Sequence, residues 1–382
     1  MKVLVAMSGG VDSSVAAALL KEQGHEVVGV TMRLWGGESD TGCCSVSDVD
    51  DARRVAQQLG IDHIVFNFTD DFQRDVVDPY VADHAQGVTP NPCIECNRHL
   101  KFDRLHERAR VLGFDAVATG HHARVAALDD GTLRLERGFD SAKDQSYVVY
   151  MLDQRHLIET MFPVGDMTKA VVREHAARLG LRTAHKPDSQ DVCFITKGRG
   201  EHASTDLVTG QPVGREGFLA RRIPLHAAEV VTDEGRVIGS VDAVELVTLG
   251  QRRGVAGGGG TKRFVVDVDV PGRRVVVGPE SALMVEHEVV ANVVWSDGLI
   301  ERSVRSDAGT RVLVQCSAHG TPHAARLVHV SSGATDGSTD RTTTVRVEWE
   351  ERQRRVSPGQ AAVFYDPTNR FVLGGGTVSR PE

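Results

Sequence analysis

The chain has 382 residues, which is enough for two or three domains with a sizeable core. Its formal net charge of -8 argues against indiscriminate nucleic-acid binding, although it is compatible with a local basic groove. No stretch is long and apolar enough to span a membrane, and the first apolar run is too short for a signal peptide. With six cysteines, we therefore expect a protein of the reducing cytoplasm, where thiols more often serve catalysis or metal binding than disulfides.

A phosphate-binding loop is predicted near the start of the chain. The apolar run at residues 3–7 predicts a buried strand, and apolar spacing predicts a helix after Ser13. Between them, Gly9 and Gly10 let the backbone fold closely around a ligand, and the N–H groups of the next helix favour an anion. Ser8, Asp12 and Ser13 add groups that suit phosphate oxygens and Mg²⁺. The lysine of the Gly-x-x-x-x-Gly-Lys-Ser/Thr loop is missing, and the alternative is a Gly-Gly turn kept for packing alone.

Strands and helices alternate over residues 1–125. Further strands are predicted at residues 26–33, 63–68 and 114–119, and further helices after Ser47, at residues 70–85 and at residues 98–112. This alternation favours parallel strands with right-handed crossovers, and thus a doubly wound α/β sheet. Ligands bind such sheets at the carboxyl ends of the strands, where the Ser8 loop, the segment after Met32 and Gly120 all fall.

The second half of the chain is rich in short β-branched runs. Helices are expected near residues 146–152 and 168–179, and strands at residues 229–231, 236–239, 243–248, 263–270, 273–277, 311–315, 325–330, 342–350 and 361–366, with one more starting near residue 288. Short strands at this spacing are typical of β-barrels and sandwiches. We expect an α/β domain over residues 1–205, a β-rich central domain over residues 206–280 and a β-barrel over residues 281–382.

The cysteines leave two chemical interpretations open. They are Cys43, Cys44, Cys93, Cys96, Cys193 and Cys316. Cys93 and Cys96 lie in a proline-stiffened loop just ahead of a predicted helix, where a thiolate is stabilised. They could bind zinc together with Cys43 and Cys44, or one of them could form a redox pair with Cys193 that handles sulfur. Cys316, in the β-rich region, fits a buried and inert thiol.

A resemblance to one enzyme family covers essentially the whole chain. The motifs that carry it are Ser8-Gly-Gly-Val-Asp-Ser13, Asn91-Pro-Cys-Ile-Glu-Cys-Asn97, Lys101-Phe102, Ala118-Thr-Gly-His121, Lys143-Asp-Gln-Ser-Tyr147, Ser189-Gln-Asp-Val-Cys-Phe-Ile195, Gly250-Gln-Arg-Arg-Gly254, Ser357-Pro-Gly-Gln-Ala361 and Gly374-Gly-Gly376. The first resembles the PP-loop of ATP pyrophosphatases, with their adenine nucleotide alpha hydrolase-like fold. Together and in this order, the motifs resemble tRNA-specific 2-thiouridylases of the MnmA/TrmU type.

The resemblance implies a reaction and a set of site residues. ATP, with Mg²⁺ and no resident cofactor or metal site, would adenylate the C2 oxygen of a wobble uridine flipped out of the tRNA anticodon. A sulfur-relay or cysteine desulfurase partner would load Cys193 with a persulfide, and Cys96 would release the sulfur and form a transient Cys96–Cys193 disulfide. The implied ATP-binding residues are Ala6, Met7, Ser8, Gly9, Gly10, Val11, Asp12, Ser13, Met32 and Gly120. The implied contacts to the target base or tRNA are Asn91, Pro92, Cys93, His121, Lys143, Asp144, Gln145 and Gln360.

Several of these positions have a simpler explanation. His121 can be a satisfied loop residue, residues 143–145 a solvated charged triplet, and Gln360 a turn residue after Pro358. One position also departs from the family, which commonly carries an aspartate, a suspected acid/base, where this chain has Cys93. Either proton handling passes to another group, such as Asp12 or Asp191, or the aspartate is not essential to the reaction.

Two other classes of function compete with thiolation. Another PP-loop enzyme, such as an amide-forming ligase or a lysidine synthase, would not need Cys96 and Cys193. A nucleotide sensor or a zinc-stabilised tRNA-binding module would bind zinc and release no pyrophosphate.

Overall fold

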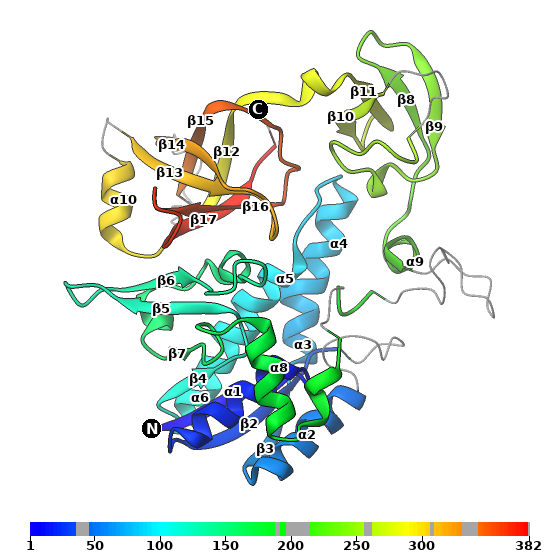
Figure 1. The fold of residues 1–382 in the computed structure, drawn as a ribbon. Helices are drawn as coiled ribbons and strands as arrows, with labels where there is room; N and C mark the ends of the chain where they lie inside the picture. Colours follow the sequence, from blue (N-terminus) through cyan, green and yellow to red (C-terminus); the bar gives the residue numbers. More distant parts are fainter. Residues whose placement is uncertain are drawn as a thin grey trace.

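The computed structural model describes residues 1–35, 46–187, 192–195, 214–255, 262–305, 309–330 and 343–380. Figure 1 shows an α/β part that carries the N-terminus, with a β-barrel and a smaller sheet beyond it. The described part of the chain contains no helix that is both long enough and apolar enough to cross a membrane.

A five-stranded sheet forms the centre of the α/β part. Its strands, in spatial order, are β3 (Asp62–Asn67), β2 (Glu26–Arg33), β1 (Lys2–Ala6), β4 (Ala116–Ala118) and β7 (Thr160–Met161). Every neighbouring pair is parallel. The strand order reverses between β1 and β4, which creates the switch point where such sheets bind ligands. The predicted doubly wound α/β fold is therefore confirmed.

Helices cover both faces of this sheet (Figure 1). One face packs against α1 (Val11–Glu22), α2 (Val46–Leu59) and α8 (Lys169–Arg178). The other packs against α3 (Thr69–Phe72), the π-helical η1 (Gln73–Val77), α4 (Asp78–Ala85), the π-helical η2 (Cys96–Arg104) and α6 (Leu105–Val111), whereas Ile94 of α5 (Pro92–Glu95) packs in the cluster shared with the barrel. Alternation along β1 explains the two cores, because Val3 and Val5 enter the first and Leu4 and Ala6 enter the second.

The remainder of the α/β part links the sheet to the barrel. It comprises the hairpin β5 (Ala123–Ala127) and β6 (Leu133–Arg137), the 3₁₀ turns η3 (Ser146–Val149) and η4 (Arg182–His185), and the short helix α7 (Gln154–Leu157). The helix expected over residues 146–152 is only the short turn η3. Its side chains reach the barrel instead, since the Tyr147 hydroxyl donates to Ala361 O at 3.0 Å and Ser146 Oγ lies 3.0 Å from the Tyr365 hydroxyl.

A second, smaller sheet follows α9 (Gly214–Ala220). Its order is β10 (Phe264–Asp269), β11 (Arg274–Gly278), β8 (Ala228–Thr232) and β9 (Val237–Val241). The strand predicted at residues 243–248 is wrong, because the chain forms the 3₁₀ turn η5 (Val244–Leu246) there. Glu245 is only 2% exposed and binds back to His226, with 2.7 Å between Glu245 Oε1 and His226 Nδ1, which suits a turn better than a strand.

The C-terminal region closes into a barrel. Its strands, in spatial order, are β12 (Met284–Trp295), β15 (Thr344–Arg354), β14 (His323–Val330), β13 (Thr310–Gln315), β16 (Ala361–Tyr365) and β17 (Val372–Val378). The turn η6 (Glu280–Leu283) precedes it, and α10 (Gly298–Val304) packs beside it. A shared apolar cluster, with Tyr147 and Tyr150 from the α/β part and Val363 and Tyr365 from β16, joins the barrel to the first part.

Candidate functional site

The loop between β1 and α1 is closed by its own serines. Ser8 N donates to Ser13 Oγ at 3.2 Å, and Ser14 Oγ donates to Gly10 O at 2.7 Å. Gly9 has a φ of +69°, and Gly10 begins α1 without any side-chain cap. The first N–H groups of a helix in this setting suit an anionic ligand.

Gly120 packs directly against this loop. It follows β4, and a Cβ atom on Gly120 would lie 2.5 Å from Ser13 N and 2.7 Å from the carbonyl carbon of Asp12. Only glycine permits so close an approach to the start of α1. The two segments that the sequence assigned to the nucleotide, after β1 and after β4, therefore meet at the switch point of the sheet.

Asp12 is the charged centre of the loop. Lys169 Nζ donates to its two carboxylate oxygens at 2.7 and 2.8 Å, and His122 Nε2 lies 3.2 Å from Oδ1. Burial by itself raises the pKa of Asp12, but the hydrogen bonds from His122 and Lys169 and the ammonium charge outweigh it and hold that pKa below its usual value. Asp12 is thus kept ionised in the ligand-free protein.

A second lysine lies beside the same loop. Lys186 Nζ donates to Asp48 Oδ1 at 2.7 Å and to Asp51 Oδ2 at 2.8 Å, and both carboxylates belong to α2. Burial lowers the pKa of Lys186, but these two carboxylates outweigh burial and raise it. A Cβ on Gly9 would lie 2.5 Å from Asp48 O, so this ion-pair cluster borders the loop.

Three other residues predicted to bind the nucleotide, Met7, Val11 and Met32, are at most 8% exposed and belong to the core. His121, predicted to contact the target base or tRNA, directly follows Gly120. His121 Nδ1 lies 2.8 Å from Thr119 Oγ1. Burial, followed by the positive charges of Lys101 and His122, lowers the pKa of His121 well below its usual value, so its ring is neutral.

The cysteine pair of the Asn91–Asn97 motif lies in a helix rather than ahead of it. The expected helix start near residue 98 is wrong, because the helical run begins at Pro92 in α5 and continues through η2 and α6. Asn91 caps it by accepting a hydrogen bond from Cys93 N at 3.2 Å, and proline is favourable at the first helical position. Cys93 is exposed, whereas Cys96 is only 7% exposed.

Cys96 and Cys193 belong to one apolar cluster. Cys96 is among its buried members, Cys193 packs against it, and Ala6 and Met32 extend it to the strand ends beside the Ser8 loop. The neighbour Phe194 anchors the Cys193 segment, with ring centroids 5.3 Å from Tyr80 and 5.0 Å from Phe218. The two cysteines, far apart in the sequence, thus border the same apolar cluster, and their direct approach to each other stays a prediction.

The zinc alternative and one proton-handling candidate fall on undescribed residues. Cys43, Cys44 and Asp191 lie outside the described residues. Within the described ranges, no three His, Cys, Asp or Glu side chains gather as metal ligands would. Cys316, by contrast, has a pKa raised to about 12, by burial first and by the charge of Glu288 second, which fits the inert thiol expected there.

Two of the predicted tRNA-contact residues are engaged within the chain. The Asp144 carboxylate accepts hydrogen bonds from Arg137 Nη1 at 2.6 Å, from Gly138 N at 2.8 Å and from both the amide and the hydroxyl of Ser146. Gln145 Oε1 accepts from His122 N at 2.9 Å. These bonds link the 143–145 segment to the Asp12 cluster, and its contact with tRNA stays a prediction.

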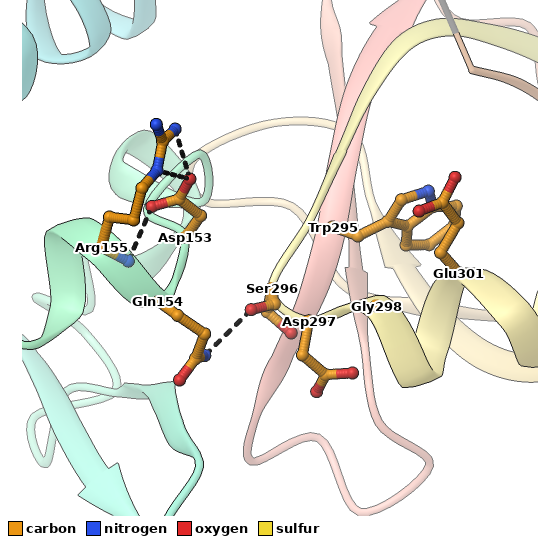
Figure 2. Close-up of a pocket in the computed structure, with 8 residues that line it drawn as sticks. All are labelled: Asp153, Gln154, Arg155, Trp295, Ser296, Asp297, Gly298 and Glu301. Atoms are coloured by element: carbon orange, nitrogen blue, oxygen red, sulfur yellow. Dashed lines mark hydrogen bonds and ion pairs between the residues drawn. The ribbon is translucent and has the colours of Figure 1, made fainter.

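A cavity of about 290 Å³ lies elsewhere, between α7 and the corner that joins β12 to α10 (Figure 2). Its lining consists of Asp153, Gln154, Arg155, Trp295, Ser296, Asp297, Gly298 and Glu301. Gln154 Nε2 donates to Ser296 O across it at 2.9 Å. The lining includes none of the predicted site residues, so we place the site at the Ser8 loop.

Sequence reasoning missed His122, Lys169 and Lys186. The repeated histidine after Gly120 could have drawn attention to His122. Lys169 opens α8 after the N-cap Thr168, and Lys186 follows the turn η4. Neither lysine lies in a local pattern that indicates its partner, since both ion pairs join segments far apart in the sequence.

The parallel sheet with its glycine-serine loop at the switch point defines a HUP-type nucleotide-binding domain followed by β-rich units. A family model described as "tRNA methyl transferase HUP domain" matches residues 1–197, and one described as "Aminomethyltransferase beta-barrel domain" matches residues 310–378.

Full-length relatives identify the family more closely. The tRNA-specific 2-thiouridylase MnmA of Chloroflexus aggregans is 44% identical over 386 residues, covering 100% of this chain and 99% of its own. The proteins of the same name from Roseiflexus sp. and Cutibacterium acnes are 42% and 41% identical, each over 99% of this chain and over 99% and 96% of their own length. The chain belongs to the tRNA-specific 2-thiouridylase MnmA family. The relatives' names speak of thiolation and the domain description of methyl transfer, and identity over the full length favours thiolation.

Proposed function

We propose that this protein is a tRNA-uridine 2-sulfurtransferase that uses ATP to replace the C2 oxygen of a wobble uridine by sulfur. The family membership supports tRNA thiolation. The observation that carries the chemical details is the apolar cluster that joins Cys96, Cys193 and the strand ends beside the Ser8 loop. A nucleotide on that loop would activate the C2 oxygen, and a pair of thiols near the loop would deliver the sulfur that replaces this oxygen.

The first step is activation of the base. ATP lies with its phosphates on the Ser8–Ser13 loop, and the C2 oxygen attacks the α-phosphate to give an adenylated uridine and pyrophosphate. Lys169 and Lys186 supply positive charge beside the loop, where it stabilises the leaving pyrophosphate. The carboxylate of Asp12 is the group that would hold the Mg²⁺ entering with ATP, and it fits because it is ionised and about a quarter exposed (28%).

The second step is sulfur transfer. A donor protein loads Cys193 with a persulfide, and the terminal sulfur of that persulfide attacks C2. The Cys96 thiolate then attacks the inner sulfur, so the S–S bond breaks, the base keeps the outer sulfur and AMP leaves. A Cys96–Cys193 disulfide remains, and an external thiol reduces it before the next turnover.

Proton handling differs from the pattern common in the family. Asp12 is ion-paired, and its lowered pKa makes it a poor proton acceptor at neutral pH. The exposed thiol of Cys93 lies at the start of α5, where the family commonly carries the aspartate, but a thiol is a weaker hydrogen-bond partner than a carboxylate, so we assign it no essential proton transfer. We assign Cys93 to the neighbourhood of the target base and Cys96 to resolution of the persulfide.

Single substitutions separate these roles. Cys96→Ser and Cys193→Ser each stop thiolation of unmodified tRNA, whereas Cys93→Ser keeps most of it. Cys316→Ala, in the barrel region, is the matched control and keeps wild-type activity. Thiolated nucleoside and released pyrophosphate are measured in parallel, because Cys193→Ser removes sulfur transfer without removing the nucleotide loop. An inactive Cys93→Ser or an active Cys193→Ser variant contradicts the assignment.

A further inference from the structure

The segment that leads into the cysteine helix is held by the barrel. Residues 86–91 connect α4 to α5, and Thr89 lies in the middle of this connection. Thr89 N donates to Pro358 O at 3.0 Å, and Thr89 O accepts from Gln360 Nε2 at 2.5 Å. Both backbone polar groups of Thr89 are therefore satisfied by a single turn, residues 357–360, between β15 and β16.

The shape of this turn suits the contact. Gly359 has a φ of +90°, and a Cβ on it would lie 2.4 Å from Val88 Cγ1 and 3.1 Å from Thr89 O. The turn is fixed to the barrel wall, since Gly359 N donates to Val378 O and Val378 N donates to Gln360 O, both at 2.9 Å. If the turn is displaced, β17 must therefore move with it.

Residues 248–250, which precede β10 of the smaller sheet, also contact Thr89 and the chain around the turn. Thr89 Oγ1 donates to Thr248 Oγ1 at 3.5 Å, and Ser357 Oγ donates to Leu249 O at 3.3 Å. Arg354 Nη2 adds a hydrogen bond to Gly250 O at 2.8 Å. All three parts of the chain thus converge on Thr89, which stands two residues before Asn91, the cap of the helix that carries Cys93 and Cys96.

We propose that Gln360 is a positioning residue for the thiol chemistry, which fixes the start of the cysteine helix relative to the barrel by holding Thr89 O. The proposal rests on the proposed function. The resemblance implied that Gln360 contacts tRNA, whereas in the structure one of its two N–H groups is committed to the protein backbone. Since Asn91 orients the first turn of α5, a shift at Thr89 passes along the helix to Cys96. RNA that binds the barrel would in this way bias the geometry of the thiols.

Two measurements on Gln360→Met test this role. At saturating tRNA, we expect kcat for thiolation to fall by about tenfold or more while the Kd for tRNA stays within about twofold, because a misplaced reacting group costs rate rather than binding. Without any tRNA, oxidation by diamide should form the Cys96–Cys193 disulfide about tenfold more slowly than in the wild type, as measured by peptide mass spectrometry. Contact with RNA cannot affect this second measurement.

The control variant changes another residue of the same turn. Ser357→Ala removes a hydrogen bond to Leu249 rather than to Thr89 and keeps both rates near wild type. If Gln360→Met unfolds at a clearly lower temperature than the wild type, the test is repeated with Gln360→Glu, which has the shape of glutamine but no N–H donor. A raised Kd for tRNA with unchanged kcat and an unchanged disulfide rate overturns the proposal in favour of direct contact. A wild type that neither thiolates tRNA nor forms the disulfide overturns the proposed function instead.

Discussion

Replacement of Gly9 by alanine tests how tightly the nucleotide loop is built. Gly9 has a φ of +69°, where a Cβ atom costs about 1–2 kcal/mol. That Cβ would also lie 2.5 Å from Asp48 O and 2.9 Å from Asp48 Cα, which are backbone atoms at the start of α2. Backbone atoms cannot rotate away as a side chain can, so the loop or α2 must shift at a further cost of about 1–3 kcal/mol. We expect Gly9→Ala to lower the free energy of unfolding by about 2–5 kcal/mol.

Gly10→Ala is the matched control for this prediction. Gly10 has a φ of -93°, which any residue adopts, and its Cβ would meet only Ser8 Oγ at 3.4 Å. Alanine is a slightly poorer N-cap than glycine but reduces the entropy of the unfolded chain. The two effects oppose each other, so we expect a change within about 1 kcal/mol.

Urea unfolding without nucleotide measures both variants, and ATP titration measures Gly9→Ala. We expect the affinity of Gly9→Ala for ATP to fall by about tenfold or more, since displacement of the loop costs at least one charge-assisted hydrogen bond to phosphate. If Gly9→Ala is as stable as Gly10→Ala, the reasoning from the close approach of Asp48 is refuted.

Three further predictions follow from buried or paired charges. Lys169→Met should weaken ATP binding by about tenfold to a hundredfold in a calorimetric titration, because a charge-assisted hydrogen bond is worth about 1.5–3 kcal/mol. An unchanged affinity for ATP would exclude this lysine from the phosphate site. Hydrogen bonds that His99 donates to the carboxylates of Asp103 and Glu95 raise its pKa to about 9. The stabilisation by this group is therefore complete below its usual pKa near 6.5 and is lost as the pH rises through about 9. Urea unfolding should accordingly show His99→Gln less stable than wild type below pH 6.5 but not above pH 9, and a difference independent of pH contradicts this. Arg137→Met removes the cationic partner of the 6% exposed Asp144 carboxylate and leaves it only neutral donors, so it should lose about 3–5 kcal/mol of unfolding free energy. A loss below about 1 kcal/mol, as for a surface pair, would contradict this.

Much of the fold could be predicted from local patterns. The helix expected over residues 168–179 is α8, with Thr168 as its cap and Gly180 at a φ of +63° just after it. Capping residues and glycines at helix ends act through neighbouring backbone groups, so a single sequence reveals them. The parallel sheet followed from the alternation of strands and helices in the same way.

The misses have tertiary causes. Residues 243–248 have the composition of a strand, but the hydrogen bonds of the buried Glu245 carboxylate with His226 favour a turn. The cysteine helix begins at Pro92 because Asn91 caps it, although Pro90 and Pro92 suggested a loop. Long-range packing overrides local propensity in the first case, and in the second the local cap was overlooked.

The candidate site shows the same division. The proximity of the Ser8 loop and Gly120 was predictable, because the carboxyl ends of neighbouring parallel strands meet at one edge of the sheet. Lys169 and Lys186 were not, because an ion pair between distant segments leaves no periodic trace. Both lysines form ion pairs with carboxylates beside a loop that lacks the lysine of the commoner phosphate-binding motif.

Nucleoside mass spectrometry of tRNA tests the central claim most directly. Unmodified tRNA with a wobble uridine is incubated with the protein, ATP and a persulfide source, and then digested. The account predicts 2-thiouridine at the wobble position, with one pyrophosphate released for each thiolated base. The absence of 2-thiouridine, under conditions where a known thiouridylase produces it, would contradict the account.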